Sequence, residues 1–337
     1  MEVNLADQLS REHSAGAQVG AGGAWAETTD DIAEVAYVIG LEGPKEQEAS
    51  ESVERAIYDG DPLVRLLSGR LGLRGRTMAL IGLGWGLVYL FVLPTLFGSL
   101  GSRNGYLGSL DDWHAQILLL LVFPATCAFY VWQPRAIAGV YQAMGLQGKS
   151  AEAGKAYRRR LWLGLSIVAA IAIVLFDGPK MIARYESWWM VDNWLAFCGR
   201  EASLAAAFYI LSMMAWRQVV STLQWRRSFA SPSPVMGLRA ASAYQLSLAL
   251  LLALLGLRLS VEGIELPRRA GAITPDYYLK IAAYIVASLL CFFTPTWAGF
   301  RREGVPRADQ LVVWLELVGI IALPLLGFII LRLALGS

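Results

Sequence analysis

Seven apolar runs constrain this chain more than any motif within it, because they are long enough to form membrane-crossing helices once the third is extended by a turn. The hydrocarbon core of a bilayer is about 30 Å thick, so a spanning helix needs about 20 mainly apolar residues. The runs are Met78–Leu100, Ala115–Trp132, Leu161–Phe176, Ala202–Val220, Ala240–Leu257, Ile281–Phe300 and Leu311–Leu335. None shows the alternation of apolar and polar residues that marks barrel strands. We therefore predict an all-α fold, a polytopic integral membrane bundle of seven transmembrane helices.

The composition and the cysteines agree with this fold. Hydrophobic residues make up 56% of the 337 residues and charged residues 17%, which is unlike a soluble domain. The three cysteines, Cys127, Cys198 and Cys291, fall in or beside the apolar runs. Their odd number and their spacing fit neither a disulfide framework nor a CxxC metal motif. We expect them to be small apolar side chains within helices.

Basic residues predict the orientation of the bundle, because Lys and Arg concentrate in cytoplasmic loops. Beyond residue 61, the segments before the first, third, fifth and seventh runs hold 17 of them, and the segments on the opposite side hold 9. We therefore expect the N-terminus inside and the C-terminus outside. The chain would be a multi-pass protein of the plasma membrane, which is the inner membrane if the source is bacterial.

The N-terminal part differs in composition and divides the chain into three regions. Residues 1–61 carry fourteen acidic residues against three basic ones, which is typical of a mostly disordered cytoplasmic tail. Within it, the apolar spacing of Asp31–Ile39 predicts one short helix. Residues 62–76 predict a basic amphipathic helix, capped by Asp61, that lies on the membrane surface or continues into the first span. Residues 77–337 would form the seven-helix transmembrane domain.

Two arginine clusters are expected to contact the bilayer. Arg158, Arg159 and Arg160 abut the third run, and Arg226 and Arg227 follow the fourth. A basic cluster beside a span is typical of anchoring to anionic headgroups, so we expect anionic lipid and not nucleic acid as the partner. The loop before the first cluster predicts an amphipathic helix whose apolar face holds Ile137, Val140, Tyr141 and Met144.

The stretch "SLDDWHAQ" before the second run holds two carboxylates, Asp111 and Asp112, and one of the two histidines, His114. Acidic residues at this position typically cap free N–H groups at the start of a helix. A cation site on the outer face is the alternative. Zinc, however, prefers three or four ligands that are mostly His or Cys, so further acids would have to fold close to His114. We therefore predict a helix start here.

Few polar groups lie within the predicted spans. Glu316, in the seventh run, is the main intramembrane charge, and such residues are functional candidates by default. Its expected depth of about 9 Å matches the reach of Arg217, at the inner end of the fourth run. We predict that Glu316 and Arg217 pair, either to lock two helices together or to form a proton- or cation-responsive site. Gln245, in the fifth run, adds further polarity.

The sequence favours a function without catalysis. It contains no P-loop, histidine cluster, haem-ligand pair or serine-hydrolase signature, so no catalytic residue, metal or cofactor is predicted. A membrane-complex subunit, scaffold or sensor, with a membrane-protein partner or as a homo-oligomer, needs few intramembrane polar groups. A transporter or channel that uses Glu316 is the alternative, supported by prolines in four of the spans. A second alternative is an enzyme that acts on a lipid-linked substrate, supported by outer acids near tryptophans.

Overall fold

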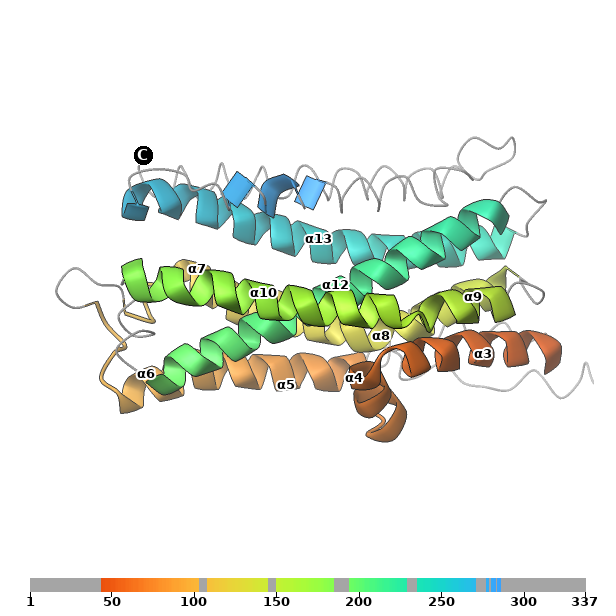
Figure 1. Cartoon of the computed structure of the whole chain (residues 1–337), viewed down its shortest axis with the longest axis horizontal. Helices are drawn as coiled ribbons and strands as arrows, with labels where there is room; N and C mark the ends of the chain where they lie inside the picture. The colour runs from red at the N-terminus through yellow and green to blue at the C-terminus, as the bar shows by residue number, and fades with distance from the viewer. Residues whose placement is uncertain are drawn as a thin grey trace, which may run out of the picture. The chain divides into compact units, whose positions relative to one another are not determined.

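The computed structural model describes residues 44–102, 108–144, 150–184, 194–228, 235–270, 277–278, 280–282 and 284–285. All of them belong to the compact unit Leu41–Ser337. The secondary structure of this part of the chain consists of helices joined by turns, with no strand (Figure 1). The predicted all-α fold is therefore confirmed for the described residues.

Three short elements precede the first predicted span: α3 (Pro44–Gly60), α4 (Pro62–Val64) and the π-helical turn η1 (Arg65–Arg70). The elements that follow are α5 (Gly75–Leu87), η2 (Val88–Val92), α6 (Leu93–Leu96), α7 (Trp113–Ile117), η3 (Leu118–Val122), α8 (Phe123–Ala143), α9 (Ser150–Tyr157), α10 (Arg160–Arg184), α12 (Trp194–Ser228) and α13 (Val235–Ala270). The turns η2 and η3 each end just before a proline at the start of the next helix. Proline has no backbone N–H, and such wide turns accommodate the hydrogen bond that is therefore missing from the helix.

Five described segments are long and apolar enough to cross a membrane. They are Gly75–Leu96, Ala115–Ala143, Ala151–Phe176, Trp194–Trp225 and Ser247–Ile264. Each overlaps one of the first five predicted runs, which indicates a membrane protein. Most of the sixth run and all of the seventh lie outside the described residues. Seven spans and the orientation therefore stay predictions.

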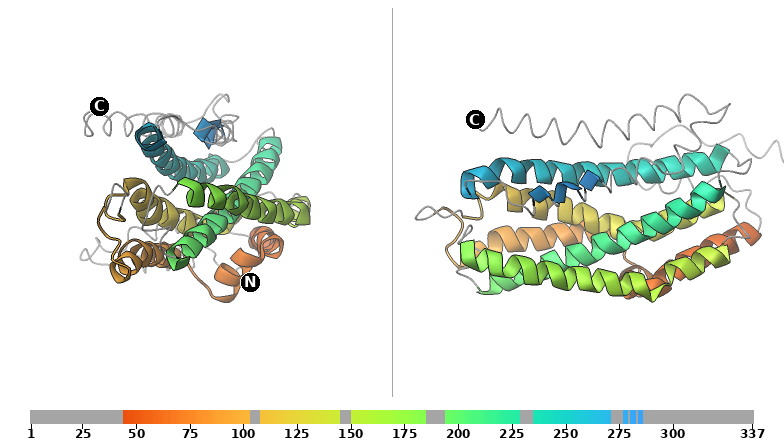
Figure 2. Two further views of the ribbon diagram at one scale, coloured as in Figure 1. Left: turned by 60° about the vertical axis from the view of Figure 1, so that its left-hand side comes forward. Right: turned by 45° about the horizontal axis from the view of Figure 1, so that its top comes forward.

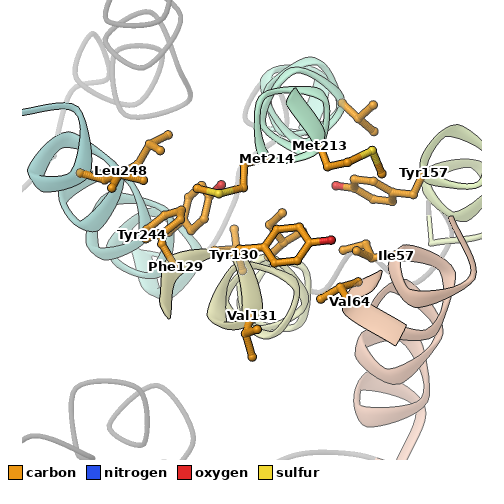
Figure 3. Packing of buried hydrophobic residues seen from close by; sticks show 14 of the residues in the cluster. Ile57, Val64, Phe129, Tyr130, Val131, Tyr157, Met213, Met214, Tyr244 and Leu248 are labelled. Atoms are coloured by element: carbon orange, nitrogen blue, oxygen red, sulfur yellow. The ribbon is translucent and has the colours of Figure 1, made fainter. Parts of the chain in front are cut away.

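Helix α8 occupies the centre of the packing, because it contacts α3, α5, α12 and α13 (Figure 2). The main core forms around it. Figure 3 shows Tyr130 of α8 among side chains from the neighbouring helices, such as Ile57, Met213 and Tyr244, whereas Val131 points to the opposite side of α8. Large aromatic side chains fill this core, since Tyr130, Tyr244 and Trp225 are all fully buried.

Two glycines bring α5 close to the helix that contains α8. A Cβ at Gly82 would lie 3.0 Å from the Cα of Pro124, and a Cβ at Gly86 would lie 2.3 Å from the carbonyl oxygen of Leu119. The glycines are four residues apart, so they share one face of the helix. This is the small-xxx-small contact by which membrane helices approach each other without a hydrophobic driving force.

Residues 44–60 correct the predicted tail. The sequence placed them in the disordered segment 1–61, but Pro44–Gly60 form helix α3. Val53, Ala56 and Ile57 lie on one face of α3 and are buried, and α3 packs against α8 and α9. The acidic composition obscured this short apolar stripe, because the charges sit on the opposite face. Residues 1–43, including the helix predicted at Asp31–Ile39, lie outside the described residues.

The amphipathic helix predicted after the second span is present but is not a separate element. Helix α8 continues through Pro134 to Ala143. The four residues of the predicted apolar face are all buried: Ile137, Val140, Tyr141 and Met144. The helix continues because this face keeps packing on the core beyond the length that a bilayer requires.

Candidate functional site

The site begins at Asp61, which stands between α3 and α4. Its Oδ1 accepts hydrogen bonds from the backbone N–H groups of Leu63 (3.1 Å) and Val64 (3.4 Å), and Pro62 occupies the first helical position. The predicted N-cap is therefore confirmed. The preceding residue must be glycine, because a Cβ at Gly60 would lie 2.3 Å from the carbonyl oxygen of Tyr157 in α9. The chain thus turns tightly and directs Asp61 into the bundle.

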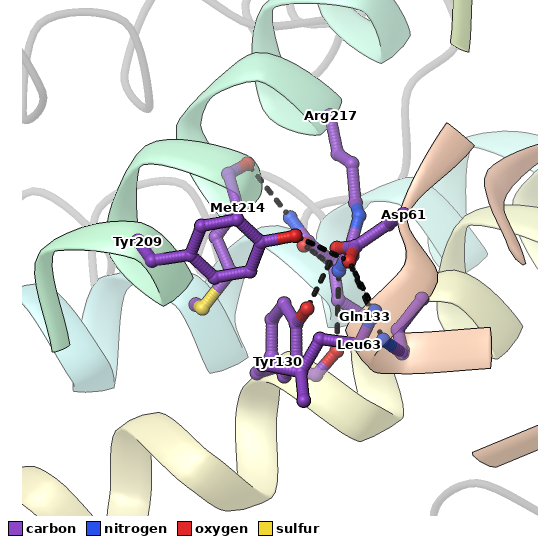
Figure 4. Close-up of polar contacts among 8 residues, drawn as sticks. Asp61, Leu63, Tyr130, Gln133, Tyr209, Met214 and Arg217 are labelled. Atoms are coloured by element: carbon purple, nitrogen blue, oxygen red, sulfur yellow. Dashed lines mark hydrogen bonds and ion pairs between the residues drawn. The ribbon is translucent and has the colours of Figure 1, made fainter. Parts of the chain in front are cut away.

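Inside the bundle, Asp61 forms an ion pair with Arg217 of α12 (Figure 4). The guanidinium Nη2 donates to Oδ2 of Asp61, and the two side chains are only 4% and 1% exposed. Two tyrosines complete the surroundings of the carboxylate. The hydroxyl of Tyr130 in α8 donates to Oδ2 at 2.7 Å, and that of Tyr209 in α12 donates to Oδ1 at 2.9 Å. Both carboxylate oxygens therefore accept hydrogen bonds from protein donors.

Arg217 has further partners on α8. Its Nη1 donates to the backbone carbonyl of Tyr130 (3.2 Å) and to Oε1 of Gln133 (3.3 Å). The guanidinium also lies over the ring of Tyr130, 4.7 Å from its centroid. Arginine suits this position because its planar group donates in several directions while one face stacks on an aromatic ring.

The network extends from Gln133 to α13. The side-chain amide of Gln133 donates to the carbonyl of Met214 (3.1 Å) and to the hydroxyl of Tyr244 (2.9 Å). Tyr244 in turn donates to Oε1 of Gln218 at 2.6 Å. One continuous set of hydrogen bonds thus joins the segment before the first span to three helices of the bundle: α8, α12 and α13.

The energetics of this site favour a fixed arrangement. Burying two charges is costly, and it is tolerated when the pair is well placed and its remaining hydrogen-bonding groups are satisfied. Removing one partner would leave the other charge buried without compensation, at a cost of about 3–5 kcal/mol. The pair therefore specifies where α3 and α4 sit against α12.

Tyr58, in the last turn of α3, extends the contact between α3 and its neighbours. Its hydroxyl donates to Glu54 and lies 3.2 Å from Oγ of Ser68. Burial, and after it the hydrogen bond to Glu54, raises the pKa of Tyr58 above its ordinary value of 10.0. The phenol therefore stays protonated, and able to donate, at every pH near neutrality.

Among the predicted intramembrane residues, the structure places Arg217 at the centre of the site. Its described acid partner is Asp61 and not the predicted Glu316. Glu316 lies outside the described residues, so its proposed pairing stays a prediction. Gln245 lies in α13, but its side chain also falls outside the described part.

The stretch "SLDDWHAQ" forms a capped helix start. Oδ1 of Asp112 accepts from the backbone N–H of Ala115 at 3.0 Å, which confirms the predicted cap of α7. Asp111 instead accepts from the backbone N–H of Ser102 at 3.1 Å and from its hydroxyl. The side chain of His114 is not among those described. Within the described residues, no group of three or more His, Cys, Asp or Glu is placed to hold a metal ion.

The basic cluster between α9 and α10 is exposed. Arg158, Arg159 and Arg160 all present surface, and Nε of Arg158 donates to the carbonyl of Gly154 at 3.2 Å. Arg226 and Arg227 lie near the end of α12, and their side chains fall outside the described part. Exposure makes the first cluster available to anionic headgroups, so its expected contact with lipid stays a prediction.

Sequence reasoning missed the polar side chains that surround the ion pair. All of them lie within long helices that are mainly apolar: Tyr130, Gln133, Tyr209, Gln218 and Tyr244. Their spacing was the available signal, because Tyr130 and Gln133 are three residues apart and so share a helix face. Polar side chains on one face of a span generally point into the bundle.

A second buried acid was also missed, because the predicted fifth run ended at Leu257. Helix α13 continues to Ala270, and it carries Glu262 with 7% of its surface exposed. Glu262 lies 3.2 Å from Arg258, one helical turn earlier, and pairs with Lys280. The two cations compensate the charge of Glu262, and the contact with Lys280 joins α13 to the short helical segment around residue 280.

No protein-family model, curated protein or solved structure matches this chain. The chemistry of the site therefore has to carry the functional conclusion. A buried ion pair within a continuous network of hydrogen bonds holds the helices that share it in register.

Proposed function

We propose that this chain is a non-catalytic, multi-pass membrane protein that acts as a complex subunit, scaffold or sensor. In this role it couples the segment before its first span to the helical bundle. That segment comprises α3, Asp61 and α4. Seven spans, an inside N-terminus and a plasma-membrane location belong to the same proposal. The bias of 17 basic residues against 9 supports the orientation.

One observation carries the proposal: Asp61, at the joint between α3 and α4, is buried in an ion pair with Arg217 of α12. A displacement of α3 by a few ångströms would break the pair and leave Arg217 buried without a charged partner. The position of α3 and the packing of α12 are therefore energetically linked. Linkage of this kind is reciprocal, so a partner that moves either element shifts the other.

A cross-link between α3 and α9 tests the proposal. The Cβ of Ala56 lies 3.3 Å from the position that a Cβ would take at Gly154, close to the separation found in disulfides. In a background without the native cysteines, Ala56→Cys with Gly154→Cys should form a disulfide rapidly under mild oxidation. Asp61→Asn should slow this reaction, because asparagine still caps α4 but no longer pairs with Arg217.

Asp59→Asn is the matched control, since Asp59 is exposed and lies two residues from Asp61. It should leave the cross-linking rate unchanged. Hydrogen exchange then separates coupling from simple anchoring. If Asp61→Asn frees α3 but leaves amide exchange around Arg217 and Tyr244 unchanged, α3 is anchored without being coupled, and the proposal is wrong.

A further inference from the structure

A small pocket lies beside the ion pair, where α3, α9, α10 and α12 meet. Its walls include Gly60, Tyr157, Trp162, Trp216, Arg217 and Val220. They are mostly apolar, and the space admits a group about the size of one water molecule. The rings of Trp162 and Trp216 stack here with their centroids 4.1 Å apart.

Two of the residues that line this pocket carry buried N–H groups without an acceptor in the described part of the chain. They are Nε of Arg217 and Nε1 of Trp162. Arg217 is 3% exposed, and its two terminal nitrogens are already used by Asp61, Tyr130 and Gln133. A buried donor without a partner costs about 1–3 kcal/mol, and more when it is charged. An oxygen acceptor in the pocket would therefore stabilise both donors.

The rim of the pocket is basic. In the turn between α9 and α10, the Cα of Arg158 lies 3.4 Å from the position that a Cβ would take at Gly60. Arg159 and Arg160 follow in the same turn and are exposed. Beyond them, α10 presents exposed aliphatic side chains, among them Leu161, Leu165 and Val168. Positive charge thus adjoins an apolar helix face at the mouth of the pocket.

We propose that this pocket binds the phosphate of an anionic phospholipid. One phosphate oxygen would enter and accept hydrogen bonds from Nε of Arg217 and Nε1 of Trp162. The remaining phosphate charge would face Arg159 and Arg160, and the acyl chains would lie along α10. Charge complementarity and the adjoining aliphatic face select this ligand over a soluble anion. The inference does not depend on the coupling of α3 to the bundle.

The indole of Trp162 offers a direct readout in the intact protein. Protein labelled with 5-fluorotryptophan is placed in nanodiscs of phosphatidylcholine, and its ¹⁹F spectrum is followed as phosphatidylglycerol is added. Trp162→Phe keeps the ring stack and identifies the signal by its loss. Trp194→Phe is the matched control, because Trp194 is exposed at the far end of α12. We expect the Trp162 signal to shift saturably with phosphatidylglycerol.

Substitution of Arg159 and Arg160 tests whether these arginines bind the charged phosphate. Arg159→Gln with Arg160→Gln should raise the amount of phosphatidylglycerol needed for half the shift by roughly tenfold. Arg70→Gln with Arg74→Gln, which removes two other exposed charges, should change it by less than about twofold. If the signal does not shift, or shifts equally with phosphatidylcholine, the pocket holds water and the proposal is wrong. A shift with oleate but not with phosphatidylglycerol would assign the site to a carboxylate and would also overturn it.

Discussion

Helices α8 and α10 are similarly apolar, yet they occupy opposite environments. In the most apolar stretch of the span that contains α8, 50% of the residues are buried in the protein. In the corresponding stretch of the span that contains α10, only 6% are buried. Helix α8 packs on four other helices, whereas the principal contact of α10 among the described residues is with α12. Similar hydropathy therefore does not imply similar packing.

Helices α8 and α10 pack differently because polar and small residues occur at the contacts of α8, whereas mainly aliphatic side chains lie along α10. Helix α8 directs Thr126, Tyr130 and Gln133 into the bundle, and the α5 glycines allow a close backbone approach beside it. Helix α10 carries mainly exposed aliphatic side chains, such as Ile171 and Leu175. Lipid is as apolar as leucine, so aliphatic surface alone does not drive helices together in a bilayer. Close backbone contact and internal hydrogen bonds do so for α8.

Among the changes that compare the packing of these helices, the largest expected effect concerns the glycine contact beside α8. Gly86→Ala should lower the free energy of unfolding by about 2–3 kcal/mol, because its Cβ would meet the backbone oxygen of Leu119 at 2.3 Å. Gly84→Ala is the matched control, because no atom beyond its own turn of helix lies within 4 Å of its Cβ position. It should be neutral or stabilising by up to about 1 kcal/mol. Unfolding in SDS titrations measures both, and equal effects would show that α5 does not approach α8 closely.

Matched valine truncations compare the two helices directly. Val131 of α8 is 1% exposed and Val168 of α10 is 62% exposed. Val131→Ala should cost about 1–2 kcal/mol through lost packing. Val168→Ala should cost less than about 0.5 kcal/mol, since lipid replaces the missing contacts. A cost at Val168 equal to that at Val131 would mean that α10 is packed against another protein surface.

The start of α7, which leads into α8, should depend on its cap. Asp112→Ala removes the acceptor for the N–H of Ala115 and should cost about 1 kcal/mol. Asp112→Asn retains an acceptor and should recover most of that loss. Thermal unfolding followed by circular dichroism measures the pair. Equal losses for both variants would mean that the charge of Asp112, and not its capping, stabilises the helix.

The smallest effect is expected at the ion pair between Arg135 of α8 and Glu54 of α3. Nε of Arg135 lies 3.5 Å from Oε1 of Glu54, but the Arg135 side chain is 47% exposed and that of Glu54 is 28% exposed. Solvent screens such pairs, so Arg135→Gln should cost less than about 0.5 kcal/mol, and added salt should remove the difference. A large, salt-independent loss would show that α3 is held by this contact instead of by Asp61.

Much of the fold could be predicted from apolar length alone, because a bilayer imposes it. The five described spans follow this rule. Helix α3 could not be predicted in this way. The composition averaged over residues 1–61 hides a stripe of three apolar residues, which is buried only when α3 packs against α8 and α9. The continuity of α8 also escaped prediction, because packing on the core joins the second span and the predicted amphipathic helix into one helix.

The site was predictable only in part, because the carboxylate of Asp61 both caps a helix and pairs with an arginine. Sequence correctly marked Asp61 as an N-cap, and it singled out Arg217 as a polar candidate among the spans. It did not connect them, because they are 156 residues apart and a capping aspartate is normally exposed to solvent. Only the fold shows that Oδ1 caps α4 while Oδ2 receives Arg217.

A double-mutant cycle on Asp61 and Arg217 tests the central claim most directly. Asp61→Asn and Arg217→Gln are measured singly and together by unfolding under identical lipid conditions. If the pair locks the segment before the first span to α12, each single change costs about 3–5 kcal/mol, and the double variant costs at least about 2 kcal/mol less than their sum. Additivity within about 0.5 kcal/mol would contradict the account. The same cycle on Glu316 and Arg217 would then decide whether the pairing first expected from the sequence replaces it.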